Sequence, residues 1–533
     1  MKKLLLASAL SAIYLPASAT PFMPMDARGL AMGNTGVASA KLAHAPAYNP
    51  SLLAQAKDSD DFAIIFPQFG INVADEDNVI DEGELINDDL VPQFEEEFSD
   101  SNSDNFNTAI DNVSASAEQL SIQIDSLDDN DGRTNQQKAT DLRNDNKSLE
   151  DNIRVLQTKV NEVDAITNDL TKSLASISGN PLRARAGVGT AMAFPGKKLA
   201  VALTVRADAN ISGRVLFSDD DLNLINGYGD AANGYLGSTG DLVSSINNLA
   251  DQVDTGSVNT DDINQTIAKV DNVTNYTSDP LQTQQGSISI IDGGDLNPAA
   301  EDPAFDSYVE IAAIAIAEVG ISFAREFSAS DRTFTVGITP KLQKVATYHA
   351  VQQISEEDNA PDVKIEDSEI TTNHINFDIG ASFYLDNSHK WRMGVVVLDA
   401  IGKDFDIADV AIDGDADGSI VTGTTVSISP KLRTGVSYEH KWLTVSSDLD
   451  ITRNEPLAYE NATQYASIGM EADIASFMQL RTGFRTNLAG NSNVVSAGLG
   501  LSPFGLSIDF AVMADISSPE RDLGAALETG FRF

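Results

Sequence analysis

The sequence predicts an all-β transmembrane barrel of about 14 antiparallel strands, with an N-terminal plug and a helical hairpin insert. Segments of about ten residues alternate apolar with polar side chains, as strands do when one face meets lipid and the other lines a lumen. Short and long connections alternate between these segments, which is typical of bacterial outer-membrane barrels. The last segment ends in "TGFRF", and a strand with an aromatic edge is protected from aggregation when it closes a barrel.

The strand pattern extends from residue 62 to residue 533, and we expect this whole region to form the barrel. The segments are about 62–71, 183–194, 198–217, 307–325, 332–351, 369–385, 390–402, 425–439, 441–453, 463–474, 477–487, 493–502, 504–515 and 524–533. An even number of strands places both termini on the periplasmic side and every long connection outside the cell. Trp391 and Trp442 lie beside short turns, where a periplasmic aromatic girdle is expected.

Both ends of the chain have features of targeting signals. Residues 1–19 are predicted to be a signal peptide, because Lys2 and Lys3 precede an apolar stretch too short to span a bilayer and an Ala-Ser-Ala sequence follows it. At the other end, Phe531 and Phe533 resemble the aromatic signal that the barrel-assembly machinery reads. We therefore expect the chain to be exported and inserted into the lipid of the cell outer membrane.

Composition excludes several classes of function. The formal net charge is −44, whereas a nucleic-acid binder needs a positive surface. The absence of cysteine excludes disulfides, thiolate catalysis and cysteine-zinc sites. The sequence contains no H-E-x-x-H, G-x-S-x-G or P-loop motif. We expect no enzyme activity and no organic cofactor.

Two acidic inserts interrupt the strand pattern, at residues 72–182 and 218–306. In the first insert, apolar residues at three-four spacing extend from Leu149 to Ile177, over about four heptads, and more briefly from Val113 to Leu127. The spacing favours a helical hairpin on the outer face, with intermolecular coiled-coil assembly as the alternative. The second insert is rich in Asn, Asp and Gly, which indicates an acidic extracellular loop.

The opening of the mature chain, residues 20–61, is rich in Gly, Ala and Pro. Its stretch "RGLAMGNTGVASAKLAHAPAYNPSLLAQ" resembles the start of the long-chain fatty-acid transporter (FadL-type) family of outer-membrane barrels. The matching residues are Arg28, Gly29, Gly33, Gly36, Asn49 and Pro50. The resemblance implies a plug of short helices inside a 14-stranded barrel, and a free periplasmic arm is the alternative. The layout, with large inserts, also resembles the branch of these barrels named conjugal transfer protein TraF.

Basic side chains gather on the predicted inner face of an otherwise acidic chain. They are Arg183, Arg185, Arg206, Lys341, Lys431, Arg433, Arg481 and Arg485. Buried charges need partners, so one interpretation pairs them with inward-facing Asp208, Asp448, Asp450 and Asp509 and with the plug. The alternative is a path for anionic or carboxylate solutes, because rings of basic residues select anions.

One predicted loop has a possible metal-binding pattern. In "DGDADGSI", Asp413, Asp415 and Asp417 occupy alternate positions before Gly418, which matches the first half of a calcium loop. Thr424 stands where a bidentate Glu would complete the ligand set. Calcium is therefore the single candidate cofactor, and a chance pattern in an acidic chain is the alternative.

These observations together indicate an outer-membrane channel for passive uptake of small apolar or amphipathic solutes. The alternative is a barrel-anchored surface protein for adhesion or conjugation. In the FadL-type family, a kink in the third strand opens the barrel wall sideways. The resemblance therefore implies that Gly213, near the end of the third predicted strand, lies close to such an opening, because glycine within a strand marks a bulge or kink. An ordinary strand with an axial pore is the other possibility.

Overall fold

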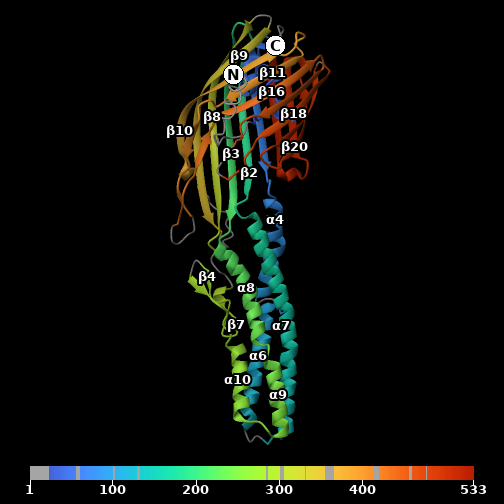
Figure 1. The fold of residues 1–533 in the computed structure, drawn as a ribbon, viewed down its shortest axis with the longest axis vertical. Coiled ribbons are helices and arrows are strands. Elements are labelled where there is room, and N and C mark those ends of the chain that lie inside the picture. The colour runs from blue at the N-terminus through green and yellow to red at the C-terminus, as the bar shows by residue number, and fades with distance from the viewer. Residues whose placement is uncertain are drawn as a thin grey trace, which may run out of the picture.

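Fourteen antiparallel strands form a closed barrel (Figure 1), as the sequence predicts. The computed structural model describes residues 23–55, 61–99, 103–128, 132–283, 286–300, 305–329, 332–354, 365–412, 419–454, 459–475 and 477–532. In their order around the barrel, the strands are β1 (Ala63–Ala74), β2 (Pro181–Phe194), β3 (Ala200–Leu216), β8 (Tyr308–Ala329), β9 (Arg332–Gln353), β10 (Ile370–Tyr384), β11 (Trp391–Leu398), β16 (Lys431–His440), β17 (Leu443–Asp450), β18 (Tyr465–Ala475), β19 (Met478–Asn487), β20 (Asn493–Leu501), β21 (Leu506–Asp515) and β22 (Leu523–Arg532). Pairing of β1 with β22 closes the barrel.

The predicted strands at 390–402 and 425–439 are wrong in one respect. β11 ends at Leu398, and the next strand, β12 (Lys403–Asp406), leaves the barrel to pair with β15 (Thr425–Ile428) in a separate sheet. The barrel strand β16 starts only at Lys431. Pro430 separates β15 from β16, and proline has no N–H group for a strand ladder.

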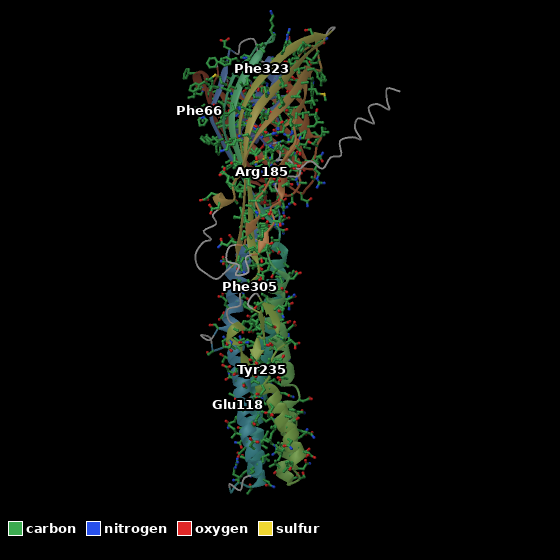
Figure 2. All side chains as sticks on the ribbon, turned by 90° about the vertical axis from the view of Figure 1, so that its left-hand side faces the viewer. Phe66, Glu118, Arg185, Tyr235, Phe305 and Phe323 are labelled. Atoms are coloured by element: carbon green, nitrogen blue, oxygen red, sulfur yellow. The ribbon has the colours of Figure 1, made fainter. Side chains whose placement is uncertain are left out.

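Side chains alternate between the two faces of the barrel wall. In β1, Phe69, Ile71 and Val73 are 46–59% exposed on the outer face, whereas Gln68 and Asn72 are buried on the inner face. Large exposed apolar residues recur in this phase on the other strands, including Phe323 on β8 (Figure 2). An apolar outer surface around a polar interior is the pattern of a transmembrane barrel.

The two inserts fold together into a helical bundle that extends from the end of the barrel where β1 is connected to β2 and β3 to β8 (Figure 1). The first insert forms α4 (Val79–Leu85), a π-helical turn (Ile86–Leu90), α5 (Val91–Phe98), α6 (Phe106–Asp125) and α7 (Asn135–Ile177), and the second forms α8 (Asp219–Ser238), α9 (Leu242–Thr255) and α10 (Thr260–Thr274). The predicted hairpin corresponds to α6 and α7. Among the described residues, no helix combines the length and apolar character needed to cross a membrane.

The second insert, expected as an acidic extracellular loop at 218–306, contains the helices α8, α9 and α10, which its composition did not suggest. Its apolar residues repeat at three-four spacing, as in Leu224, Tyr228 and Ala231 on α8 and Leu242, Ile246 and Leu249 on α9. These residues are buried against those of α6 and α7 in a single core. Asn and Asp, which suggested a loop, cap helices instead, as Asn259 caps α10.

The remaining elements are short. Small hairpins pair β4 (Leu281–Thr283) with β5 (Gly286–Ile288), β6 (Ile291–Asp292) with β7 (Asp295–Leu296), and β13 (Val410–Ala411) with β14 (Ile420–Val421). Residues 23–55 form the plug, with α2 (Ala27–Ala31), α3 (Ala45–Tyr48) and a 3-10 turn (Pro50–Gln55). Nearly all plug residues are buried, because the plug fills the barrel lumen. A free periplasmic arm is therefore excluded for these residues.

Candidate solute pathway

The plug contacts the barrel wall where the strands have glycine. Inward-facing glycines stand opposite each other in neighbouring strands, as Gly337 with Gly380, Gly394 with Gly435, and Gly469 with Gly483. A Cβ atom on Gly483 would lie 2.1 Å from the backbone nitrogen of Gly33. A Cβ atom on Gly337 would lie 2.5 Å from the carbonyl carbon of Pro50. Because glycine has no Cβ, the plug backbone can lie directly on the wall.

All six plug residues suggested by the FadL-type resemblance are buried in the lumen. Gly29 packs against the ring of Tyr48, and Pro50 begins the 3-10 turn. The Arg28 Nε donates a hydrogen bond to Glu471 at 2.9 Å, and the Asn49 side-chain amide donates one to the Val37 carbonyl at 2.9 Å. The backbone amide of Gly33 donates to the Ser496 hydroxyl at 3.1 Å, and that of Gly36 donates to the Asp448 carboxylate at 2.8 Å. The four hydrogen bonds among these contacts join the plug to itself or to β17, β18 and β20. The plug is therefore held by polar contacts as well as by shape.

The eight basic residues predicted to face the lumen all have inward positions, and each forms an ion pair. The pairs are Arg183 with Glu76, Arg185 with Glu460, Arg206 with Glu318, Lys341 and Lys431 with Asp399, Arg433 with Asp450, Arg481 with Glu471 and Asp509, and Arg485 with Asp522. Their charges are thus compensated inside the wall. This arrangement favours the structural interpretation over an open ring of positive charge.

Glu471 joins two plug cations and one wall cation. This carboxylate on β18 is 1% exposed and lies 2.9 Å from Arg28, 3.0 Å from Lys41 and 2.8 Å from Arg481. Two of the three cations belong to the plug. Sequence reasoning missed Glu471, because the residues that it joins are far apart in the chain.

A small polar cavity lies beside the plug. It measures about 80 Å³ and is lined by Met25 of the plug and by Arg206, Glu318, Lys341 and Asp399 of the wall. Because about 10–15 Å³ of water-accessible space is enough for one water, the cavity has room for several water molecules. A solute of several carbon atoms fits at this point only if the plug or the lining side chains shift.

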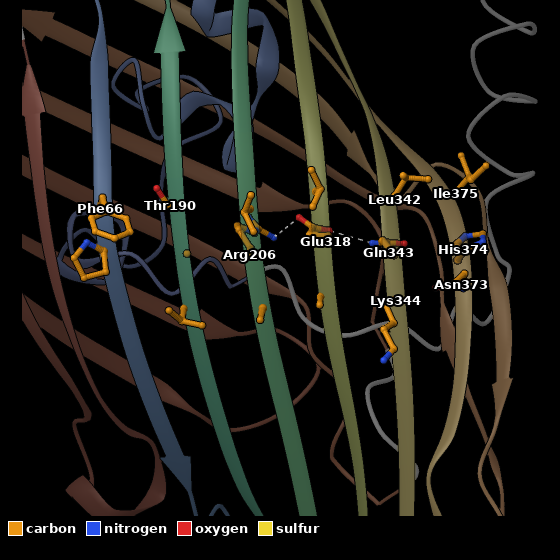
Figure 3. A pocket seen from close by; sticks show the side chains of 17 residues that line it. Phe66, Thr190, Arg206, Glu318, Leu342, Gln343, Lys344, Asn373, His374 and Ile375 are labelled. Atoms are coloured by element: carbon orange, nitrogen blue, oxygen red, sulfur yellow. Dashed lines mark hydrogen bonds and ion pairs between the residues drawn. The ribbon is translucent and has the colours of Figure 1, made fainter.

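An apolar groove of about 760 Å³ lies on the outer face of the wall at the level of this cavity. Outward side chains such as Val188, Val205 and Leu342 line it, and the backbone at Arg206, Glu318 and Gln343 separates it from the lumen (Figure 3). The groove and the cavity share these last three residues. The wall between the lumen and the lipid is thus a single layer of strands at this point.

The strand beside the groove is irregular. Between Ile65 and Gln68, β1 has one additional residue relative to both β2 and β22, which defines a β-bulge. The carbonyl groups at the bulge accept hydrogen bonds from hydroxyl groups on the neighbouring strands. Thr190 of β2 donates to Ile65 at 2.7 Å, and Thr529 of β22 donates to Phe66 at 2.5 Å.

The strand ladder is regular at Gly213, where the resemblance suggested an opening. Gly213 pairs with Leu182 on one side and Ile311 on the other, and β3 keeps a constant register with both neighbours. A regular ladder leaves no kink at this glycine, since the outward and inward residues stay in phase through the end of the strand. Pro67, within the bulge of β1, was the signal in the sequence that marks the irregular strand instead.

A second hollow, of about 320 Å³, lies at the end of the barrel with the short turns. Its lining is rich in basic groups from the plug and from two turns: Lys41, His389, Lys390, Arg392, His440 and Lys441, with Glu439 as the acidic residue. The guanidinium of Arg392 lies 5.2 Å from the ring centre of Tyr384. This basic mouth contrasts with the acidic composition of the chain. Its residues have no regular spacing in the sequence by which they could have been found.

Some predicted residues lie outside the described part of the chain. These are the signal peptide at 1–19, the possible calcium ligands Asp413, Asp415 and Asp417, and the terminal Phe533. Phe531 is described, and its side chain is 46% exposed on the outer face of β22. The calcium site and the assembly signal therefore stay predictions.

Solved structures that align with most of this chain include two transporters and a channel. The Ralstonia pickettii toluene transporter TbuX is 10% identical, with 95% of this chain and 98% of that chain covered and a TM-score of 0.43. The Pseudomonas putida toluene transporter TodX is 8% identical, with 97% and 98% covered and a TM-score of 0.40. The CymD monoaromatic hydrocarbon channel is 8% identical, with 96% and 98% covered and a TM-score of 0.37.

No curated protein matches the chain. A family model does match, over residues 46–142 and 134–450, and this region is more than half of the chain. The match confirms the resemblance to the TraF-named barrels. The chain belongs to the family described as F plasmid transfer operon, TraF, protein.

Proposed function

We propose that this protein is an outer-membrane channel for the passive uptake of small apolar or amphipathic solutes, which leave the lumen sideways beside β1. The observation that carries the proposal is the position of the apolar groove. It lies outside the small lumen cavity, shares Arg206, Glu318 and Gln343 with it, and adjoins the bulge of β1. The proposed solute enters from outside, displaces part of the plug and passes the bulge into the lipid.

The chemistry of the wall supports an apolar solute. The lumen charges are already paired with one another. An ionic solute that leaves water for this interior therefore gains little electrostatic stabilisation. On the lipid side, Val188, Val205 and Leu342 offer an apolar surface to a solute that leaves water.

A disulfide across the irregular seam tests this route. Phe69 of β1 and Val188 of β2 are opposite each other and face outward, so we would replace both with cysteine. Val445 and Met470, opposite each other in the regular β17–β18 seam, give the matched control pair. Uptake of radiolabelled toluene or oleate is measured in cells that lack other transporters for these probes.

Oxidation of the Phe69–Val188 cysteine pair should reduce uptake to the level of cells without the protein, and reduction should restore it. Oxidation of the control pair should leave uptake unchanged. Equal uptake with both pairs oxidised would exclude the sideways route and favour an axial path past the plug. No uptake by the wild-type protein would contradict the channel itself.

One observation favours a second candidate function, surface contact through the helical bundle. The bundle extends from the end with the long connections, and α7 alone has 43 residues, or about 65 Å at 1.5 Å per residue. Such a length would carry an acidic tip beyond the surface of the membrane. In this alternative the barrel is only an anchor. Removal of the bundle then abolishes adhesion or conjugation, and neither the shortened nor the wild-type protein mediates solute uptake.

A further inference from the structure

Three ligand-type side chains meet where the plug touches the last barrel strand. Asp26 caps the N-terminus of α2, His44 precedes α3, and Glu528 points inward from β22. The His44 Nε2 lies 2.9 Å from Glu528 Oε1 and 3.7 Å from Asp26 Oδ1. One ligand atom from each residue can be chosen so that all three lie within 4.8 Å of one another. This spacing is close to that of donor atoms around one metal ion, for which only small side-chain shifts are needed.

The charges in this cluster are not balanced by fixed cations. Asp26 and Glu528 are 2% and 1% exposed, and the ion pairs among the described residues join both of them to His44 alone. The nearby Arg28 is engaged by Glu471 at 2.9 Å. Two buried carboxylates therefore face one imidazole. Burial of an uncompensated charge is costly, and a divalent cation would neutralise both carboxylates with His44 neutral.

Two atoms of the cluster also lack partners. In the part of the chain that the structure describes, the buried Glu528 Oε2 and His44 Nδ1 have no hydrogen-bond partner. The carboxylate of Asp26, by contrast, is fixed by the Gly29 amide at 2.7 Å and the Tyr48 hydroxyl at 2.6 Å. Hydrogen bonds of this kind orient a ligand and are typical around metal ions.

We propose that Asp26, His44 and Glu528 bind one divalent transition-metal ion that fastens the plug to β22. The donor set of one imidazole nitrogen and two carboxylate oxygens suits Zn²⁺ and similar ions. Calcium and magnesium, which prefer oxygen ligands alone, fit it less well. The ion would link residues 26 and 44 of the plug to residue 528 near the closing seam of the barrel.

Equilibrium dialysis of the purified full-length protein in detergent tests this site. The protein is stripped with EDTA and dialysed against zinc chloride in excess Mg²⁺, so that Mg²⁺ occupies exposed carboxylates of the bundle. Metal content is measured by mass spectrometry. We expect one zinc ion per wild-type chain and at least a tenfold weaker affinity in His44→Gln and Glu528→Gln, which keep the size and hydrogen bonds of the side chains.

His349→Gln is the matched control, because His349 is also buried and paired with a carboxylate, Glu310, at 3.0 Å. It should bind zinc as the wild type does. Equal binding by wild type, His44→Gln and Glu528→Gln would overturn the proposal, and so would an equal loss in His349→Gln.

Cobalt provides a test on the wild-type protein alone, which holds even if the variants fail to assemble. One equivalent of Co²⁺ should give the intense visible absorption of a four- or five-coordinate site, and zinc should abolish it. A spectrum of hydrated Co²⁺ only would show that the cluster holds a proton between His44 and Glu528 in place of a metal.

Discussion

The barrel lumen and the helical bundle use charge in opposite ways. In the lumen, Arg433 and Arg485 are among the largest fully buried side chains. Asp450 of β17 pairs with the first, and Asp522, just before β22, pairs with the second. The bundle has an apolar core instead, and several of its ion pairs are exposed, as in Arg154 with Glu150, which are 66% and 46% exposed. Residues 75–180 and 218–307 contain 42 acidic against 8 basic residues, so about −34 of the net charge of −44 belongs to the inserts.

Because of this difference, we expect different interactions to stabilise the two regions. A buried ion pair that loses one partner leaves an uncompensated charge, whereas an exposed pair exchanges its partner for water. The plug therefore depends on charge pairing and close backbone contact, and the bundle depends on its apolar core. Substitutions that remove a lumen charge, a close glycine contact, an apolar core side chain or an exposed ion pair therefore separate these contributions.

Glu471→Ala should have the largest effect. It leaves Arg28, Lys41 and Arg481 without their shared carboxylate and should cost about 3–5 kcal/mol, as other broken buried pairs do. The loss of unfolding free energy is measured by urea unfolding of the detergent-solubilised barrel, with heat-modifiable mobility in gels as the readout. An unchanged midpoint would show that the lumen charges do not hold the plug.

Leu156→Ala should destabilise the bundle by a similar or somewhat smaller amount. Leu156 is fully buried on α7 in the core shared by both inserts, and a cavity of this kind costs about 2–5 kcal/mol. We expect an earlier thermal loss of helical circular dichroism while the heat-modifiable mobility of the barrel stays normal. A parallel loss in both readouts would mean that barrel and bundle unfold as one unit.

Gly483→Ala should have an intermediate effect confined to the plug. The new Cβ would lie 2.1 Å from the Gly33 nitrogen, a backbone atom, and overpacking of this kind costs about 1–3 kcal/mol. Displacement of the plug should expose Lys41 to faster trypsin cleavage. Gly213→Ala is the control, because its Cβ would meet its nearest atom at an ordinary 3.6 Å. Equal cleavage of the two variants would argue against close plug packing.

Glu150→Gln should have the smallest effect. It breaks an exposed pair one helical turn apart on α7, and such pairs contribute about 0.3–0.5 kcal/mol. The thermal midpoint of the bundle should hardly move, and high salt should remove the remaining difference. A loss comparable to that of Leu156→Ala would mean that the bundle surface is as dependent on charge as the lumen is.

Strand positions could be predicted from the sequence because lipid on one side and a polar lumen on the other impose a strict alternation on every strand. Phe69, Ile71 and Val73 on β1 show this alternation. The long helix α7 was predictable for a similar reason, since its apolar residues repeat along one stripe. The inward direction of Lys341 and Arg481 followed from strand phase alone.

The partners of these residues could not be predicted, because register around a barrel joins segments far apart in the chain. Glu471 meets Arg28 across 443 positions. The helices of the second insert were missed because Asp, Asn and Gly suggest turns, although Leu242, Ile246 and Leu249 already had helical spacing. The glycines beneath the plug were visible as inward-phase glycines, but their purpose becomes clear only when the plug is in place.

The most direct test of the account compares solute uptake with and without the bundle. Both inserts, residues 75–180 and 218–307, are replaced together with short loops, because the apolar face of each insert packs on the other. Uptake of radiolabelled toluene or oleate is measured in cells with equal amounts of assembled barrel. A channel formed by barrel and plug predicts that uptake by the shortened protein equals that of the wild type. Loss of all uptake in the shortened protein, or none in the wild type, would contradict it.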